Sequence, residues 1–305
     1  MEIPRRRLLA WLGAGLAAGA ENPLLERWRR IAGGIDGEVG AAVLHLGSGS
    51  GSESHVSLNG QDRFPLASVC KLPIAMNVLA MVDEGKWALA DNIEVLPQDI
   101  IPSVGDIAER WPRQKRFQLG ELIELMIEKS DNTAVQTLFR IGGGAPAMAA
   151  RFRQWRITGV RIDRSERQCS LDAAGIEHVP PMEQWTGAMF EHLLAKTTPA
   201  SRYAGMRKFL ADPRDTGTPD GTVQLLARTF RGELLRQSTT ALLVRSLEGT
   251  TTGKRRLKGL LPSDTIVAHK TGTTRTENGL NGATNDVGVI TLAGGRGQLV
   301  IAVYV

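Results

Sequence analysis

The stretch that decides how this chain is interpreted is Ser68-Val69-Cys70-Lys71, which follows the run Arg63-Phe64-Pro65-Leu66-Ala67. It opens an apolar segment over residues 72–79 that predicts an amphipathic helix. In such a helix Ser68 and Lys71 share one face of the first turn, so the amine reaches the hydroxyl. A serine hydroxyl becomes a good nucleophile once a base takes its proton. The motif alone fits equally well a solvated serine beside a lysine whose stem covers apolar surface.

Three further motifs change this interpretation. Ser130-Asp131-Asn132 follows a helical pattern over residues 119–129, and Lys270-Thr271-Gly272-Thr273 follows a strand-like run over residues 265–268. The order SxxK, SDN, KTG is a known set of serine-acylation motifs. A fourth stretch, Arg161-Ile162-Asp163-Arg164-Ser165-Glu166, lies between the second and the third. Four motifs in one order are far more specific than any one of them.

With these motifs the chain resembles a class A β-lactamase, and the resemblance covers residues 24–305. It implies an α+β, multi-domain serine β-lactamase fold, with an antiparallel sheet flanked by helices and an all-helical domain. We expect the sheet domain at residues 22–64 and 213–305 and the all-helical domain at residues 65–212. The latter includes an Ω-loop at about residues 161–216, with an insertion at residues 175–211 that the family lacks.

Hydrophobic periodicity predicts the remaining elements. Helices are expected at residues 23–32, 72–84, 133–140, 146–155, 182–194, 202–210, 219–228 and 238–248. Strands are expected at residues 37–46, 55–58, 265–268, 286–292 and 298–305. The family ends in a long helix, whereas this sequence stops in its last predicted strand, so we expect either a truncated sequence or a missing element.

The resemblance also implies catalytic roles. Ser68 would be the nucleophile, Lys71 the acylation base or a proton relay, and Ser130 the donor of a proton to the leaving lactam nitrogen. Glu166 would activate the water that hydrolyses the acyl-enzyme. The backbone N–H groups of Ser68 and Thr273 would form the oxyanion hole, in which one donor is worth about 3–4 kcal/mol.

Substrate binding is expected from a second set of residues. Asn132 would hold the side-chain amide of the substrate, and the carboxylate would be bound by Lys270, Thr271, Gly272 and Thr273. Arg256 matches the place of an auxiliary carboxylate-binding arginine in some family members, although it lies in Lys254-Arg255-Arg256 and fits a surface arginine equally well. Asp131 is expected to cap local turns.

One position departs from the family pattern. The family has an asparagine four residues after the catalytic glutamate, where this chain has Ser170. A hydroxyl lacks the separate donor and acceptor groups of an amide. Efficient deacylation is therefore the step that this substitution puts in question.

Cys70 and Cys169 are the two cysteines of the chain, and each lies within three residues of a proposed catalytic residue. The bridge of some class A carbapenemases would need cysteines at Ala67 and near residues 274–275, so it is absent here. Two alternatives remain open: buried thiols that act as small hydrophobes, or a disulfide that ties the Ω-loop to the nucleophile helix.

The N-terminus predicts export. Arg5-Arg6-Arg7, an apolar run over residues 8–18 and Ala18-Gly19-Ala20 form a signal peptide over residues 1–20. The arginines fit a twin-arginine signal as well as an ordinary one, and the mature protein is expected to be periplasmic or secreted. No cysteine follows the apolar run, so no stable membrane anchor is expected.

Composition excludes other classes of function. A formal charge of +5 without interleaved aromatic residues does not indicate a nucleic-acid site. The histidines show no metal spacing, so we expect no metal, no cofactor, a small-molecule β-lactam as substrate and a monomer. The rivals are a D,D-peptidase, against which Glu166 argues, and a non-catalytic β-lactam or peptidoglycan-binding module, which Ser170 favours.

Overall fold

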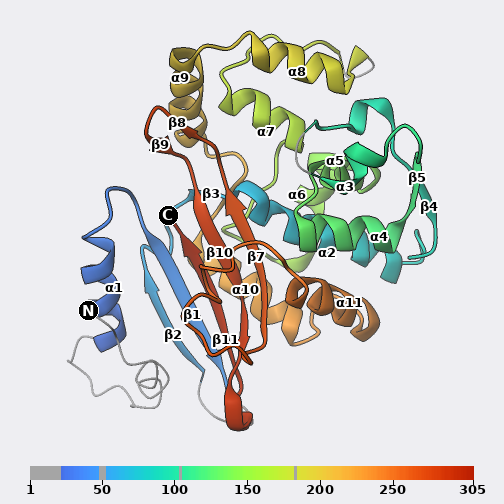
Figure 1. Ribbon diagram of the computed structural model, residues 1–305. Helices are drawn as coiled ribbons and strands as arrows, with labels where there is room; N and C mark the ends of the chain where they lie inside the picture. Colours follow the sequence, from blue (N-terminus) through green and yellow to red (C-terminus); the bar gives the residue numbers. More distant parts are fainter. Residues whose placement is uncertain (1–21, 48–52, 103–104, 182–183) are drawn as a thin grey trace.

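The computed structural model describes residues 22–47, 53–102, 105–181 and 184–305 (Figure 1). The predicted signal peptide at residues 1–20 lies outside this range. Among the described helices, none combines the length and the hydropathy needed to cross a membrane.

A five-stranded antiparallel sheet joins the two ends of the chain, as the resemblance implied. Its order is β2-β1-β11-β10-β7, with the strands β1 Gly40–Leu46, β2 Ser54–Leu58, β7 Val267–Thr273, β10 Thr284–Thr291 and β11 Gln298–Tyr304. β1 pairs with β11 along its whole length, from Gly40 opposite Tyr304 to Leu46 opposite Gln298. The N-terminal hairpin therefore depends on the C-terminal strands for its pairing.

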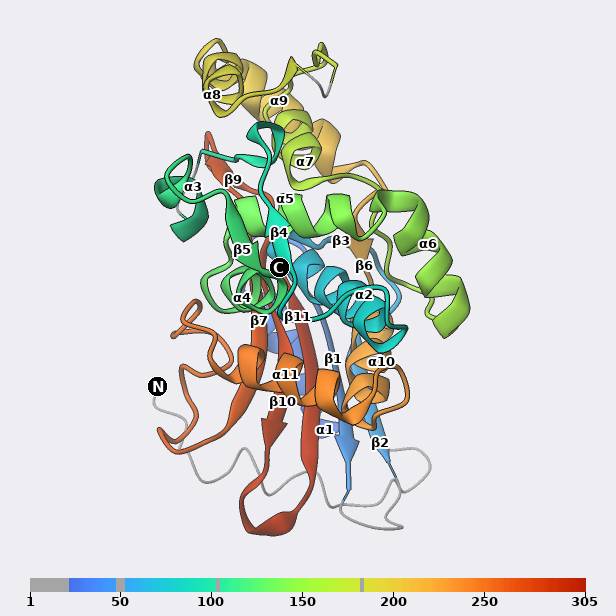
Figure 2. The same cartoon turned by 90° about the vertical axis from the view of Figure 1, so that its right-hand side faces the viewer.

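The sheet is covered on both faces. Side chains alternate along β11, so that Val300, Ala302 and Tyr304 enter one core and Leu299 enters another. Helices α10 Pro219–Phe230 and α11 Gln237–Glu248 cover the first face, and α1 Pro23–Ala32 covers the second (Figures 1 and 2). The alternation of side chains thus gives the sheet an apolar surface on both faces, against which the helices pack.

Helix α2 Lys71–Asp83 differs from the expected amphipathic helix, because residues 71–80 are all buried. It runs between α11 on one side and α5 Asn132–Ile141 and α6 Gly144–Trp155 on the other. A helix enclosed by other helices needs no polar face. The expectation of an amphipathic helix is therefore wrong, because the apolar run over residues 72–79 belongs to a helix that is buried on all sides.

The segment expected to be all-helical also contains a two-stranded sheet, β4 Asn92–Glu94 with β5 Arg116–Gln118. Short strands of this kind carry no clear alternation. Its other elements are α3 Asp106–Arg110, α4 Leu119–Glu124, the π-helical turn η3 Leu125–Lys129 and the 3-10 turn η2 Pro97–Asp99. The pair β3 Phe64–Pro65 and β6 Thr216–Gly217 lies next to the two proposed domain boundaries, which stay a prediction.

The inserted segment carries two helices of its own. α8 Gly187–Ala195 and α9 Pro199–Leu210 lie with α7 Glu166–Ala173 beyond the end of the sheet (Figure 1). α9 begins earlier than predicted because Thr198 caps it, accepting from the N–H of Ser201 at 3.1 Å. α8 corresponds to the helix predicted at residues 182–194. Of that range, residues 182–183 lie outside the described residues.

A buried ion pair closes the long loop that contains this insertion. Arg164 Nε donates to Asp215 Oδ2 at 2.5 Å, and the other oxygen of Asp215 accepts from the backbone N–H groups of Asp163 and Arg164. The side chains of Arg164 and Asp215 are 3% and 7% exposed. Both ends of the loop are therefore joined at one buried contact.

We expect the substitution Asp215→Asn to lower the free energy of unfolding by about 3 kcal/mol, because it leaves the buried Arg164 guanidinium without its main partner. Asp172 and Asp212 still contact this cation and limit the loss. Urea denaturation measures the difference. Arg214→Met is the control, because it removes an exposed partner of Asp212 and Asp172 and should change stability by less than about 1 kcal/mol. Equal effects of the two substitutions would contradict the assignment.

Candidate active site

Ser68 lies in the 3-10 turn η1 Ala67–Cys70, directly before α2, so the nucleophile motif spans a turn and the start of a helix. The turn rests on the edge strand β7. A Cβ atom on Gly272 would approach the carbonyl oxygen of Leu66 to 2.6 Å, so only glycine allows this contact. Asn285 Nδ2 on β10 donates to the same carbonyl at 3.2 Å. The sheet thereby positions the serine.

Lys71 is fully buried and does not point into solvent. Its Nζ donates to the carbonyl oxygen of Ser130 at 2.6 Å, to Ser130 Oγ at 3.0 Å and to Asn132 Oδ1 at 2.6 Å. Burial lowers the pKa of Lys71, while the carboxylate of Glu166 raises it in opposition. The first motif and the second motif are thus joined by one ammonium group.

The SDN motif forms a tight turn between two helical elements. Ser130 ends the π-helical turn η3 with φ of 59° and ψ of 34°, a left-handed conformation. Asp131 caps α5 by accepting from the N–H of Ala134 at 2.8 Å, and it also accepts from the N–H of Ile107 at 3.0 Å. The structural role expected of Asp131 is therefore the one it has.

Lys270 approaches the same serine from the sheet. Its Nζ donates to Ser130 Oγ at 3.1 Å, so the Ser130 hydroxyl lies between two buried lysines. Burial, reinforced by the nearby charge of Lys71, lowers the pKa of Lys270 to about 7. A hydroxyl with a basic amine on each side is well placed to pass on a proton.

The KTG motif lies within β7, whereas we expected it to follow the strand. The ladder with β10 continues to Thr273, which lies opposite Thr284. The polar character of Lys270 and Thr271 hid the strand from a pattern that relies on apolar runs. Because β7 is extended through residues 270–273, the KTG motif lies along one edge of the site.

Arg256 packs against the end of the KTG motif. Its Nη1 donates to the carbonyl oxygens of Gly272 at 2.9 Å and Asn285 at 2.7 Å, and its Nη2 donates to Thr273 Oγ1 at 2.7 Å. Thr271 Oγ1 is bonded separately, to the hydroxyl of Thr252 at 2.7 Å. Arg256 is therefore anchored beside the Thr273 hydroxyl and differs from a solvated surface arginine.

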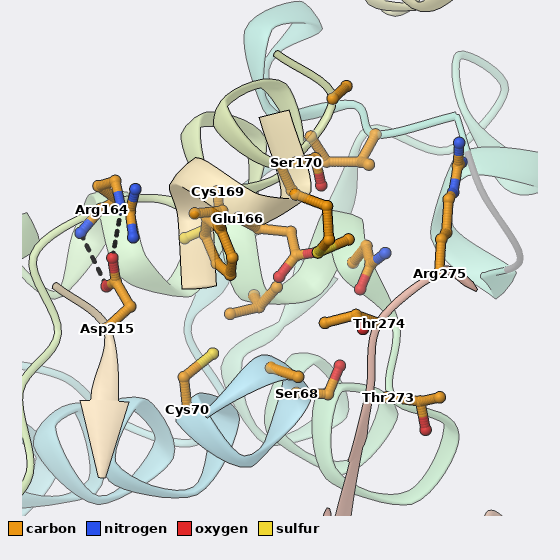
Figure 3. A pocket seen from close by; sticks show the side chains of 18 of the residues that line it. Ser68, Cys70, Arg164, Glu166, Cys169, Ser170, Asp215, Thr273, Thr274 and Arg275 are labelled. Atoms are coloured by element: carbon orange, nitrogen blue, oxygen red, sulfur yellow. Dashed lines mark hydrogen bonds and ion pairs between the residues drawn. The ribbon is translucent and has the colours of Figure 1, made fainter. Parts of the chain in front are cut away.

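Glu166 is the first residue of α7, so it lies at a helix start inside the Ω-loop. Ser165 caps this helix by accepting from the N–H of Gln168, and Gln136 Oε1 on α5 accepts from the N–H of Arg167 at 3.2 Å. Figure 3 shows Glu166 and Ser170 reaching toward Ser68 from the opposite side of a pocket. The start of α7, where Glu166 lies, is thus held by its own cap and by α5.

The pocket has a volume of about 210 Å³. Its lining contains four of the predicted residues, Ser68, Asn132, Glu166 and Thr273, together with Ser170. Lys71, Ser130 and Lys270 join this group through the hydrogen bonds given above, and Arg256 joins it through Thr273. The four motifs therefore converge on one site, which has room for a small substrate.

Cys70 and Cys169 line this pocket and are both free thiols (Figure 3). Burial raises the pKa of Cys70 to about 12 and also raises the pKa of Cys169. A raised pKa disfavours the thiolate, which is the reactive form of a cysteine. They act here as small apolar groups, which is the first of the two alternatives.

Three residues that position the site carry no strong sequence signal. They are Asn285, which holds the turn before Ser68, Gln136, which holds α7, and Asp215, which closes the Ω-loop. A polar residue inside an apolar strand or helix, such as Asn285 or Gln136, was the available hint. Among the described residues no group of three histidine, cysteine or acidic side chains could hold a metal ion.

The family described as "Beta-lactamase enzyme family" matches residues 23–305. The β-lactamase VEB-1 of Pseudomonas aeruginosa is 30% identical over 271 residues, which are 88% of this chain and 77% of that protein.

Solved structures give the same result. A β-lactamase from Chitinophaga pinensis has a TM-score of 0.74 and 29% identity, covering 92% of this chain and 89% of its own. An ancestral (GNCA) class A β-lactamase has a TM-score of 0.71 and 30% identity, covering 92% and 90%. Sequence, fold and convergent motifs agree, and the chain belongs to the class A β-lactamase enzyme family.

Proposed function

We propose that this enzyme opens β-lactams through an acyl-Ser68 intermediate and hydrolyses that intermediate with a water activated by Glu166. The observation that carries the proposal is that Ser68 and Glu166 line one pocket. A buried chain of hydrogen bonds from Lys71 through Ser130 to Lys270 lies beside them. A persistent acyl-enzyme would need no such base, so Glu166 favours hydrolysis over a D,D-peptidase reaction.

The position of Lys71 beside Ser130 supports a route for acylation. The Ser68 oxygen attacks the lactam carbonyl, and its proton passes to Lys71, whose lowered pKa makes a neutral amine available. Lys71 is hydrogen-bonded to Ser130 Oγ, which delivers a proton to the lactam nitrogen as the C–N bond breaks. The backbone N–H groups of Ser68 and Thr273 stabilise the oxyanion.

Deacylation reverses the proton flow. Glu166 takes a proton from water, the resulting hydroxide attacks the ester carbonyl, and the Ser68 oxygen leaves and regains its proton. Ser170 lies in the same pocket and supplies one hydroxyl to the water. The second contact that an asparagine amide would make is lost.

Substrate orientation comes from both sides of the site. Asn132 binds the side-chain amide, and the carboxylate meets Lys270 and the hydroxyls of Thr271 and Thr273, with Gly272 allowing close approach. Arg256 holds the Thr273 hydroxyl and adds positive charge. We further propose that the protein is exported, acts as a monomer and uses no cofactor.

Glu166→Gln should trap the acyl-enzyme, because it removes the base and keeps the shape of the side chain. Intact mass spectrometry after mixing with benzylpenicillin should show an adduct of one substrate mass, absent from Ser68→Ala. The wild type should continue to turn over a chromogenic cephalosporin. A burst equal to the enzyme concentration would instead indicate a D,D-peptidase or a binder, and wild-type turnover by Glu166→Gln would exclude the proposed base.

The kcat/KM for substrates that carry a carboxylate should fall as pH rises through about 7. Lys270 has a pKa lowered to about 7, so it is a cation below this pH and neutral above it. Binding of the carboxylate needs the cation. Lys270→Arg keeps its charge at all accessible pH values, so its basic limb should move upward. Superimposable pH profiles for the two proteins would rule out Lys270 as the titrating group.

Arg256→Ala should raise the KM for carboxylate-bearing substrates and leave folding almost unchanged. The loss of a charge-assisted hydrogen bond corresponds to roughly 1–3 kcal/mol in kcat/KM. Arg255→Ala is the matched control, because Arg255 is the exposed neighbour. Steady-state kinetics and thermal melting are measured on both variants. If the two variants have equal KM values, Arg256 has no part in substrate binding.

A further inference from the structure

The catalytic pocket continues into the inserted segment. From Ser68, Asn132 and Glu166 it extends toward α8 and α9. We call this extension the annex and define it by its apolar lining, which consists of Ile74, Val135, Phe190, Leu194, Met206 and Phe209. The insertion therefore contributes most of this lining, and α2 and α5 contribute Ile74 and Val135.

The inserted helices are held rigidly enough to form a wall. Phe190 packs with Ile101, Leu171 and Trp185 in a separate hydrophobic cluster. α9 lies so close to the end of α7 that a Cβ atom on Gly205 would approach the backbone nitrogen of Gly175 to 2.3 Å. Close backbone contact and a buried cluster fix the position of both helices.

An ion pair closes the annex on the side of the hairpin β8 Thr276–Glu277 and β9 Leu280–Asn281. Arg202 Nε on α9 donates to Glu277 Oε2 on β8 at 2.9 Å, and both residues line the pocket. The two side chains are 28% and 11% exposed. The insertion is thus joined to the hairpin that follows the KTG motif, across the pocket from α2.

The chemistry of the annex suits an apolar group of limited size. The whole pocket, catalytic part and annex together, measures about 210 Å³, so the annex leaves room only for a compact group. Removing apolar surface from water provides the driving force. Asn132, the proposed ligand of the side-chain amide, lies in the same lining, so a substituent on that amide has the annex beside it.

We propose that the annex binds the apolar part of the acylamino side chain of the substrate, and that Arg202 and Glu277 limit the length of this side chain. The inference rests on the proposed function. Compact aryl or branched alkyl side chains are then preferred over no side chain and over long chains. Phe190, Leu194 and Met206 determine this specificity without taking part in the bond-making steps.

Leu194→Ala tests the apolar contact. Benzylpenicillin carries a phenylacetyl side chain, whereas 6-aminopenicillanic acid has the same nucleus without an acyl group. The kcat/KM for benzylpenicillin should fall about tenfold, since contacts in an apolar pocket discriminate on that scale, and that for 6-aminopenicillanic acid should change less than about twofold. Leu193→Ala is the matched control on the same helix, because Leu193 lies outside this pocket. Equal losses on both substrates, or equal behaviour of the two variants, would overturn the annex.

Arg202→Ala tests the length limit independently. With penicillins whose n-alkyl side chains increase in length, the chain length at which kcat/KM falls should become longer in this variant. Lys208→Ala is the control. Lys208 lies on α9 like Arg202, but its ion pair with Glu177 is exposed. An unchanged length limit would overturn the role of the ion pair.

If the wild type hydrolyses none of these penicillins and Ser68 carries no adduct, the proposed function fails and the annex fails with it. If the wild type hydrolyses these penicillins and the variants show the same side-chain preference as the wild type, only the annex is contradicted.

Discussion

The active site depends on burying the ammonium group of Lys71. A buried charge is tolerated only where hydrogen bonds replace its water, and here Ser130 and Asn132 supply them. This need ties the start of α2 to the turn before α5, two elements that are about sixty residues apart in the chain. The same burial lowers the pKa of the amine and prepares it to accept a proton. One contact therefore stabilises the structure and, in the proposed mechanism, activates the nucleophile.

The sheet completes the site from the opposite direction. Edge strand β7 brings Lys270 to the Ser130 hydroxyl, and the absence of a side chain at Gly272 lets the turn that carries Ser68 rest on the strand. Asn285, one strand further in, bonds to the same turn. Because strands from both ends of the chain form this sheet, the site assembles only when the whole fold has closed.

The inserted segment contributes residues to the wall of the site. Arg164 and Asp215 close the loop at its base, and residues 175–211 lie between these two ends of the loop. These residues build their own small cluster around Trp185 and Phe190. They also meet the β8–β9 hairpin through Arg202, so the insertion becomes a wall of the pocket. Helices α8 and α9 are in this way connected to the pocket that contains Ser68.

The sequence by itself determined the family and most helices, because ordered motifs and periodic apolar residues are local properties. It also proposed a catalytic set, whose motifs the structure brings to one site. It misjudged α2, whose buried environment comes from neighbours distant in the chain, and it ended the strand before the KTG motif because polar residues there look like a loop. Only the tertiary structure decided that Arg256 is bonded to Thr273, that both thiols line the pocket and that α8 and α9 enclose it. These facts depend on distances between separate elements, which no local pattern encodes.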